Sequence, residues 1–163
     1  MADRRLIVIM GPSGCGKSTV ARALSDALDV PMLEGDDYHP EKNLAKMASG
    51  VPLDDSDRIG WIESMLKSAN YGNAPVMVVA CSALTPFVQE RLSNAPDFDV
   101  RFIHLNVPRE ELVKRMENRE HFMPVSLLQS QLDTLSVPDS ALTVDGLADV
   151  ETITDAIISQ LEH

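Results

Sequence analysis

The most constraining feature of this chain lies near its start, where Gly11–Ser18 reads Gly-Pro-Ser-Gly-Cys-Gly-Lys-Ser. This stretch fits the phosphate-loop pattern, in which two glycines separated by four residues are followed by Lys and then Ser or Thr. An apolar run at 6–10 precedes the loop, and a helical pattern follows it from residue 18. Strand, loop and helix in this order are the context that the motif requires. The chain is therefore predicted to bind a nucleoside triphosphate.

Each residue type in the loop has a physical role. Glycines let the backbone turn so that successive N–H groups point at a phosphate. The helix that follows adds partial positive charge at its N-terminus. Lys17 is expected to bind the β- and γ-phosphates, and Ser18 to supply an oxygen to Mg²⁺. The predicted ATP contacts in the loop are Gly11, Ser13, Gly14, Cys15, Gly16, Lys17, Ser18 and Thr19.

The order of apolar runs predicts a three-layer α/β fold built on a five-stranded parallel sheet. Strands are expected at 6–10, 32–34, 76–80, 100–105 and 142–144, and the third, the most evenly apolar, is expected to be central. Helices are expected at 18–28, 40–49, 56–70, 86–92, 108–118, 124–135 and 150–161. The helix at 56–70 is predicted to take Ser56 as its N-cap. We expect residues 1–163 to form a single domain.

Charge and composition exclude several function classes. The net charge is −11, and the stretch 120–163 holds eight Asp or Glu with no Lys or Arg, which argues against a nucleic-acid surface. No apolar stretch approaches the roughly 20 residues of a membrane span. The two cysteines, Cys15 and Cys81, have no metal-ligand spacing and are too few for a disulfide framework. These features predict a cytoplasmic protein without a nucleic-acid or membrane partner.

Acidic residues follow the second expected strand. Ligands of parallel α/β sheets bind beyond the carboxyl ends of the strands, so carboxylates here would face the γ-phosphate. Asp36 is predicted to accept the proton of an attacking substrate hydroxyl, and Glu34 to lie with Ser18 on the metal side. Capping of the helix from residue 40 remains an equally good account of Asp37.

A longer pattern then becomes visible. Residues 35–40 read G-D-x-x-H-P, and residues 43–61 read N-x-x-K-M-x-x-G-x-P-L-x-D-x-D-R-x-x-W. Cys-Ser-Ala-Leu follows at 81–84, His-Phe-Met at 121–123 and L-L-x-S-Q at 127–131, with Leu135 and Pro138 beyond. Together these motifs, which cover most of the chain, resemble the gluconate kinase (gluconokinase) family of P-loop sugar-acid kinases.

The resemblance implies ATP-dependent phosphorylation of D-gluconate on its terminal hydroxyl, giving 6-phospho-D-gluconate, with Mg²⁺. It also implies a P-loop kinase fold like those of adenylate and shikimate kinases, a lid segment at about 115–130, and a homodimer. Arg58 suits the substrate carboxylate because a guanidinium binds both oxygens at once, although pairing with Asp54 or Asp57 is an alternative. Trp61 is expected to pack in the core. The substrate residues that the resemblance implies are Asp36, His39, Lys46, Arg58 and His121.

Two arginines lie in the first part of the expected lid. Arg115 and Arg119 are predicted to bind ATP, with Arg119 on the transferring phosphoryl group. Salt bridges to Glu111 or Glu117 would also explain cations at this helix end. The predicted catalytic residues are Lys17, Asp36 and Arg119.

One segment departs from the family pattern. Family members usually follow Cys-Ser-Ala-Leu with a basic residue and then a Tyr-Arg pair, where this chain has Thr85, Val88 and Gln89, with Arg91 as a nearby cation. Two alternatives therefore stay open. One is a kinase for another small sugar acid or a shikimate-like polyol acid, and the other is a nucleotide-binding regulator without turnover.

Overall fold

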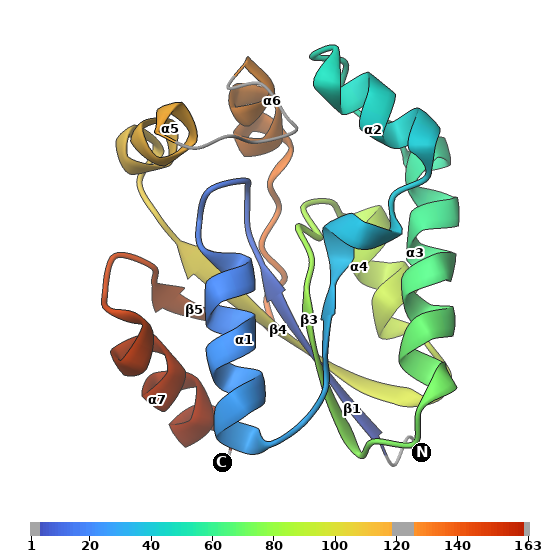
Figure 1. Ribbon diagram of the computed structural model, residues 1–163, viewed down its shortest axis with the longest axis vertical. Helices are drawn as coiled ribbons and strands as arrows, with labels where there is room; N and C mark the ends of the chain where they lie inside the picture. Colours follow the sequence, from blue (N-terminus) through green and yellow to red (C-terminus); the bar gives the residue numbers. More distant parts are fainter. Residues whose placement is uncertain (1–3, 119–125, 162–163) are drawn as a thin grey trace.

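The computed structural model describes residues 4–118 and 126–161. Its strands form one parallel sheet in the order β2-β3-β1-β4-β5 (Figure 1). The strands are β1 (Arg4–Met10), β2 (Met32–Glu34), β3 (Val76–Ala80), β4 (Phe98–Asn106) and β5 (Leu142–Asp145). The expected α/β class and the five parallel strands are thereby confirmed.

Helices cover both faces of this sheet (Figure 1). Those described are α1 (Lys17–Leu28), α2 (Glu41–Ala48), α3 (Asp55–Tyr71), α4 (Pro86–Ser93), α5 (Arg109–Glu117), α6 (Ser126–Thr134) and α7 (Val150–Leu161). Successive residues of β1 point to opposite faces, so Leu6 and Val8 pack with α3 and α4 while Ile7 and Ile9 pack with α1 and α7. Two apolar cores, one on each side of the sheet, complete three layers. Within the described part of the chain, no helix combines the length and apolar character that crossing a bilayer requires.

The middle of the sheet belongs to β1, not to β3. The strand β3 lies between β1 and the edge strand β2, so it is an internal strand, as its evenly apolar sequence predicted. The strand β4 begins at Phe98, earlier than the predicted start at residue 100. Its first residues alternate between buried and exposed positions, so they do not form the continuous apolar run on which the prediction relied. Asp99 and Arg101 lie on the exposed side and pair at 3.1 Å.

The predicted N-cap of α3 is wrong. Asp54, not Ser56, caps the helix, and its Oδ1 accepts the Asp57 N–H at 2.8 Å. The Asp57 carboxylate in turn accepts the Asp54 N–H at 3.0 Å. This reciprocal capping box needs an acceptor at the cap and another three residues later, and Ser56 would have had Ile59 in that second place.

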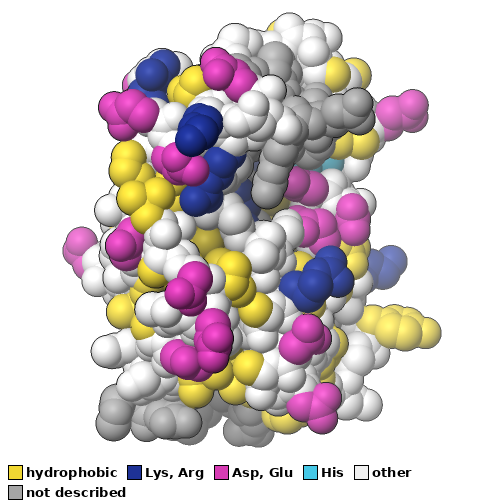
Figure 2. All heavy atoms as spheres, turned by 60° about the vertical axis from the view of Figure 1, so that its left-hand side comes forward, with side chains coloured by type: hydrophobic (Ala, Val, Ile, Leu, Met, Phe, Trp, Pro, Cys, Tyr) yellow, Lys and Arg dark blue, Asp and Glu magenta, His cyan; other side chains and the backbone are white. Residues whose placement is uncertain are grey.

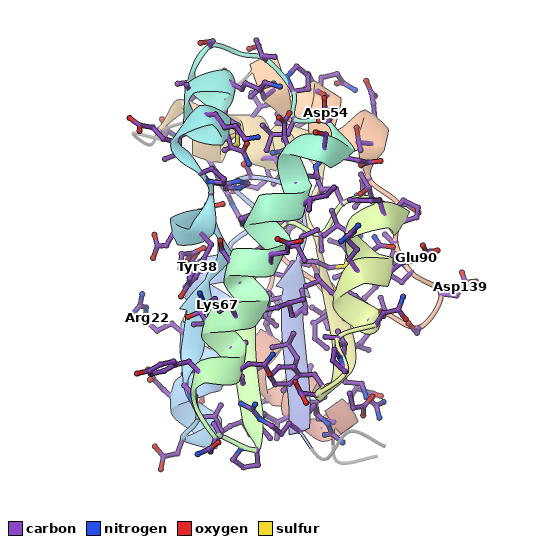
Figure 3. All side chains as sticks on the ribbon, turned by 90° about the vertical axis from the view of Figure 1, so that its right-hand side faces the viewer. Arg22, Tyr38, Asp54, Lys67, Glu90 and Asp139 are labelled. Carbon is purple, nitrogen blue, oxygen red and sulfur yellow. The ribbon has the colours of Figure 1, made fainter. Side chains whose placement is uncertain are left out.

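The carboxyl end of β2 continues into a short 3-10 helix, η1 (Gly35–Tyr38), which the sequence did not predict. A Cβ at Gly35 would lie only 2.5 Å from the Ala80 carbonyl oxygen, so only glycine allows η1 to approach β3 this closely. The Tyr38 hydroxyl is 2.9 Å from the Ser68 hydroxyl of α3. Figure 3 shows Tyr38 beside this helix, near Lys67, with Asp54 at the helix start. These contacts fix η1, and with it Asp36, between β3 and α3.

Candidate active site

Three segments that follow neighbouring strands meet at the carboxyl edge of the sheet. The phosphate loop leaves β1, η1 leaves β2, and residues 81–84 leave β3, while α2, α5 and α6 stand above this edge (Figure 1). The Gly11 N–H donates to the Ser82 carbonyl at 3.3 Å, which joins the first of these segments to the third. Residues that lie far apart in the sequence thus surround one region.

The phosphate loop has the conformation that an anion site needs. Gly16 takes φ 97° directly before α1, a left-handed geometry that a side chain would disfavour. The Lys17 ammonium donates to the Pro12 carbonyl at 3.1 Å and so lies over its own loop. A small pocket is lined by Ser13, Gly14, Gly16, Lys17, Ser18, Thr19 and Asp36. Backbone amides, a helix N-terminus and an ammonium here favour a phosphate group.

A larger cavity adjoins the phosphate pocket. Its walls come from η1, α2, α3, α4, α6 and the segment after β3. Ser13, Lys17 and Asp36 line both cavities. A phosphate end and a second molecule would therefore meet where an ammonium and a carboxylate face the same space. Asp36 is exposed to solvent there, which is compatible with the predicted role of proton acceptor.

The predicted metal-side residues lie together. The Ser18 hydroxyl donates to Glu34 Oε2, and burial raises the pKa of Glu34 above its usual value although the hydroxyl and Lys17 act against the shift. A half-buried carboxylate beside a hydroxyl is a hard oxygen pair of the kind that Mg²⁺ accepts while it keeps several waters. Among the described residues there is no cluster of three or more His, Cys, Asp or Glu that could hold a metal by themselves. The pair therefore fits a metal that is shared with phosphate oxygens.

His39 is held on two sides at the cavity wall. Its ring stacks on Trp61 with a centroid distance of 4.4 Å and an interplanar angle of 10°. Trp61 is 2% exposed and donates from Nε1 to the Gly35 carbonyl at 2.7 Å. It therefore belongs to the core, as expected, and also supports the site. Burial lowers the pKa of His39 to about 4, Asp36 opposes the shift and Arg58 adds to it.

Arg58 and Lys46 occupy different places. Arg58 lines the cavity, its side chain is 18% exposed, and Nη1 pairs with Asp55 at 3.2 Å rather than with the two acids that we expected. Lys46 does not line the cavity, and its ammonium binds Asp57 at 2.7 Å. This contact raises the pKa of Lys46 and lowers that of Asp57. Only Arg58 of these two predicted substrate residues faces the cavity directly.

Arg115 reaches the phosphate loop. Its Nη1 donates to the Gly14 carbonyl at 3.0 Å, and its Nε pairs with Glu111 at 3.2 Å. The predicted ATP contact and the alternative salt bridge are thus compatible, because different nitrogens serve them. Figure 2 shows several basic side chains gathered in the upper part of this face, with acidic side chains among them and over the rest of the face. The predictions for Arg119 and His121, and the middle of the expected lid, lie outside the described residues.

The residues that depart from the family pattern have structural roles. Thr85 caps α4 by accepting the Val88 N–H at 3.3 Å. Gln89 is buried and donates to the carbonyls of Ala83 at 2.9 Å and Ser136 at 2.5 Å. Val88 lines the cavity with an apolar side chain. Arg91 lies over the Phe87 ring at 5.0 Å and does not line the cavity, so it does not replace the missing cation.

Sequence reasoning placed the start of α6 in the expected lid but assigned none of its side chains to the site, although several contribute to it. Gln131 Oε1 accepts the Ser13 N–H at 2.8 Å and joins α6 to the phosphate loop. Ser130 and Thr134 of the same helix line the larger cavity, as does Ser82 after β3. The L-L-x-S-Q motif at residues 127–131 was the available sequence signal for this contribution. The motif does not indicate which residues its side chains contact. Neighbouring Cys81 is buried, which raises the pKa of its thiol to about 12 and leaves it unreactive.

Comparison with known proteins independently supports the fold and indicates the family. A family model described as an AAA domain matches residues 7–122. A gluconokinase from Gluconobacter oxydans is 37% identical over 97% of this chain and 92% of its own length. The crystal structure of a gluconokinase from Sinorhizobium meliloti superposes with a TM-score of 0.83 at 36% identity and covers 99% of this chain and 95% of that one. A shikimate kinase from Aquifex aeolicus, at 18% identity, covers 96% of each chain with a TM-score of 0.67 and shows the shared fold.

Proposed function

Because the chain belongs to the gluconokinase family, we propose that it transfers the γ-phosphoryl group of ATP to the terminal hydroxyl of D-gluconate, giving 6-phospho-D-gluconate. The observation that carries this proposal is the shared wall of the two cavities. Ser13, Lys17 and Asp36 line both the phosphate pocket and the larger cavity. A donor phosphate in one and an acceptor alcohol in the other would meet at these three residues.

The proposed reaction follows from that arrangement. The alcohol oxygen forms a bond to the γ-phosphorus as the bond from phosphorus to the bridging oxygen of ADP breaks. Asp36 accepts the alcohol proton, which lies on the oxygen that attacks. Lys17 and the loop amides hold the charge on the phosphate oxygens. Arg115, and Arg119 by the family resemblance, add positive charge from the lid side.

We assign the metal side to Ser18 and Glu34, whose adjacent oxygens support this choice. Bound Mg²⁺ would neutralise charge on the β- and γ-phosphates. The chain's own contribution is a hydroxyl and a carboxylate at the edge of the phosphate pocket. Because burial already penalises the ionised form of Glu34, a nearby cation would relieve that penalty.

The larger cavity suits an open-chain sugar acid. Arg58 supplies a cation for the carboxylate, and His39, Ser82, Ser130 and Thr134 supply groups for hydroxyls. Lys46 acts indirectly, because it binds Asp57, which completes the capping box of the helix that carries Arg58. His121 remains assigned to the substrate by the resemblance alone. We also propose that the protein works in the cytoplasm, as its cysteine usage predicts, and that it forms a homodimer, as the family resemblance implies. Light scattering of the purified chain tests the dimer.

A coupled assay with Mg·ATP tests the function. D-Gluconate should be phosphorylated at its terminal hydroxyl, whereas D-glucitol, which has similar hydroxyls and no carboxylate, should react poorly because Arg58 has no anion to bind. Shikimate serves as the third acceptor, since the same fold occurs in shikimate kinase. Turnover of shikimate but not of gluconate would reject the substrate assignment.

The variant Asp36→Asn tests the mechanism. It keeps the size of the side chain and removes the proton acceptor, so kcat should fall by about 10²- to 10⁴-fold. The affinity for Mg·ATP, measured by calorimetry, should change little. Asp37→Asn is the matched control, because Asp37 is an exposed neighbour that lines neither cavity. Equal turnover rates for the wild type and Asp36→Asn would mean that another group accepts the proton, whereas ATP binding without turnover in the wild type would favour the regulator alternative.

A further inference from the structure

We infer that Asn43 is a positioning residue that keeps His39 as the neutral tautomer protonated at Nε2, so that His39 donates a hydrogen bond to a substrate oxygen. The inference rests on the proposed function, because it refines how the same cavity binds a sugar acid. It assigns a role to Asn43, which the family motif at residues 43–61 includes without assigning it a function.

The contacts of Asn43 fix the direction of hydrogen bonding. Its Nδ2 lies 2.9 Å from the Asp57 carbonyl oxygen and 3.2 Å from His39 Nδ1. A backbone carbonyl can only accept, so the amide must present its nitrogen to Asp57. That nitrogen carries two hydrogens, and the second points to His39. Nδ1 must then be the acceptor, which leaves the ring proton on Nε2.

The reversed amide orientation is excluded by the same contacts. Turning the Asn43 side chain over would place Oδ1 against the Asp57 carbonyl, and two acceptors would repel each other. Asn43 is 0% exposed, and in its present orientation Oδ1 has no hydrogen-bond partner within the described structure. The side chain therefore uses both of its donors and leaves its acceptor unused, although a buried unpartnered oxygen is costly. This pattern fits a group retained to donate.

The rest of the His39 ring is oriented toward the cavity. One face stacks on Trp61, and the Nδ1 edge meets Asn43. His39 lines the larger cavity, and none of the described residues forms a hydrogen bond with Nε2. By elimination, the Nε2 edge faces the space where the sugar acid is proposed to bind. Burial also holds the pKa of His39 at about 4, so the ring stays neutral near pH 7 and leaves the role of base to Asp36.

Nitrogen NMR of the full chain without ligand tests the tautomer directly. The two ring nitrogens of a neutral histidine have different ¹⁵N shifts according to which one carries the proton. The chain has four histidines, and His39→Gln identifies the signals of residue 39. We expect Nε2 to be protonated and Nδ1 to be unprotonated at pH 7. A proton on Nδ1, or a charged ring, would overturn the inference whether or not gluconate is the substrate.

The variant Asn43→Asp tests the positioning role. A carboxylate cannot donate to Nδ1 but can accept from it, so a proton should move onto Nδ1 of His39. The signals of buried His104 should not move and serve as the internal control. The KM for gluconate should rise about tenfold, with the KM for Mg·ATP unaffected. If Nδ1 stays unprotonated in Asn43→Asp, Asn43 does not set the tautomer.

Two variants of His39 cover the case in which Asn43→Asp does not fold. In His39→Gln an amide nitrogen can take the place of Nε2, whereas in His39→Asn it takes the place of Nδ1. The KM for gluconate should therefore be about tenfold lower in His39→Gln than in His39→Asn. Equal KM values would mean that donation from the Nε2 position is not used. If the wild type does not phosphorylate gluconate, the proposed function fails while the tautomer measurement still decides this inference.

Discussion

At the scale of single residues, burial shifts the pKa values of two side chains near Asp36 in opposite directions. It raises the pKa of Glu34 and lowers that of His39, because in both cases the neutral form is favoured. Asp36 lies between them and remains exposed. The site thus combines a half-buried carboxylate, a neutral imidazole and an exposed carboxylate, the proposed base, within one short stretch of chain.

His39 should make the protein less stable in mild acid. Its pKa is about 4 in the folded state and 6.5 without the fold, so the unfolded chain binds the extra proton first as the pH falls. The stability that this group contributes is present above pH 6.5 and is lost as the pH falls toward 4. Urea unfolding from pH 7.5 to pH 4 should show a smaller loss in His39→Gln than in the wild type. Parallel curves for the two proteins would contradict the shift.

At the scale of elements, the start of α3 positions the substrate side of the site. The capping box of Asp54 and Asp57 fixes where this helix begins. Arg58 and Trp61 follow within the next two turns and both line the cavity. An error of one residue at the cap would rotate both side chains, so the cap links local helix geometry to substrate binding.

Removing the cap should therefore cost both stability and affinity. Asp54→Ala leaves the Asp57 N–H without its acceptor and should lower the free energy of unfolding by about 1 kcal/mol. The KM for gluconate should rise more than the KM for Mg·ATP, because α3 carries no phosphate-loop residue. Glu63→Ala, an exposed position on the same helix, is the control and should change stability by less than about 0.5 kcal/mol. Equal effects of the two variants in urea unfolding would contradict the role of the cap.

The same elements show what a sequence can and cannot reveal. The phosphate loop and the strands around it were predicted because glycine spacing and apolar runs are local signals. The N-cap of α3 was missed because four neighbouring polar residues could each accept a hydrogen bond, and only the reciprocal partner decides among them. The contact of Gln131 with the phosphate loop and that of Asn43 with the Asp57 carbonyl could not be predicted, since they depend on how α6 and α2 meet other elements above the sheet. Arg58 pairs locally with Asp55 of its own helix, and with several acids nearby the sequence alone did not single out that one.

At the scale of the whole molecule, an acidic protein binds two anions. The net charge is −11, so long-range repulsion opposes the approach of ATP and a sugar acid. Local cations must overcome it, and Lys17, Arg58 and Arg115 come from three different helices that converge on one edge of the sheet. Binding should therefore couple these helices and stabilise the entire fold.

Ligand-linked stability measures that coupling. At Mg·ATP concentrations about 100 times the Kd, the folded state should gain about 2.7 kcal/mol, seen as a higher Tm in thermal unfolding. Removal of Mg²⁺ with EDTA should reduce the gain. In Glu34→Gln the ligand-free protein should be no less stable than the wild type near pH 7, because the substitution removes a half-buried ionised group. The Mg²⁺-dependent part of the gain should nevertheless shrink, since a carbonyl oxygen replaces a carboxylate. A gain of full size in this variant would place the metal away from Ser18 and Glu34.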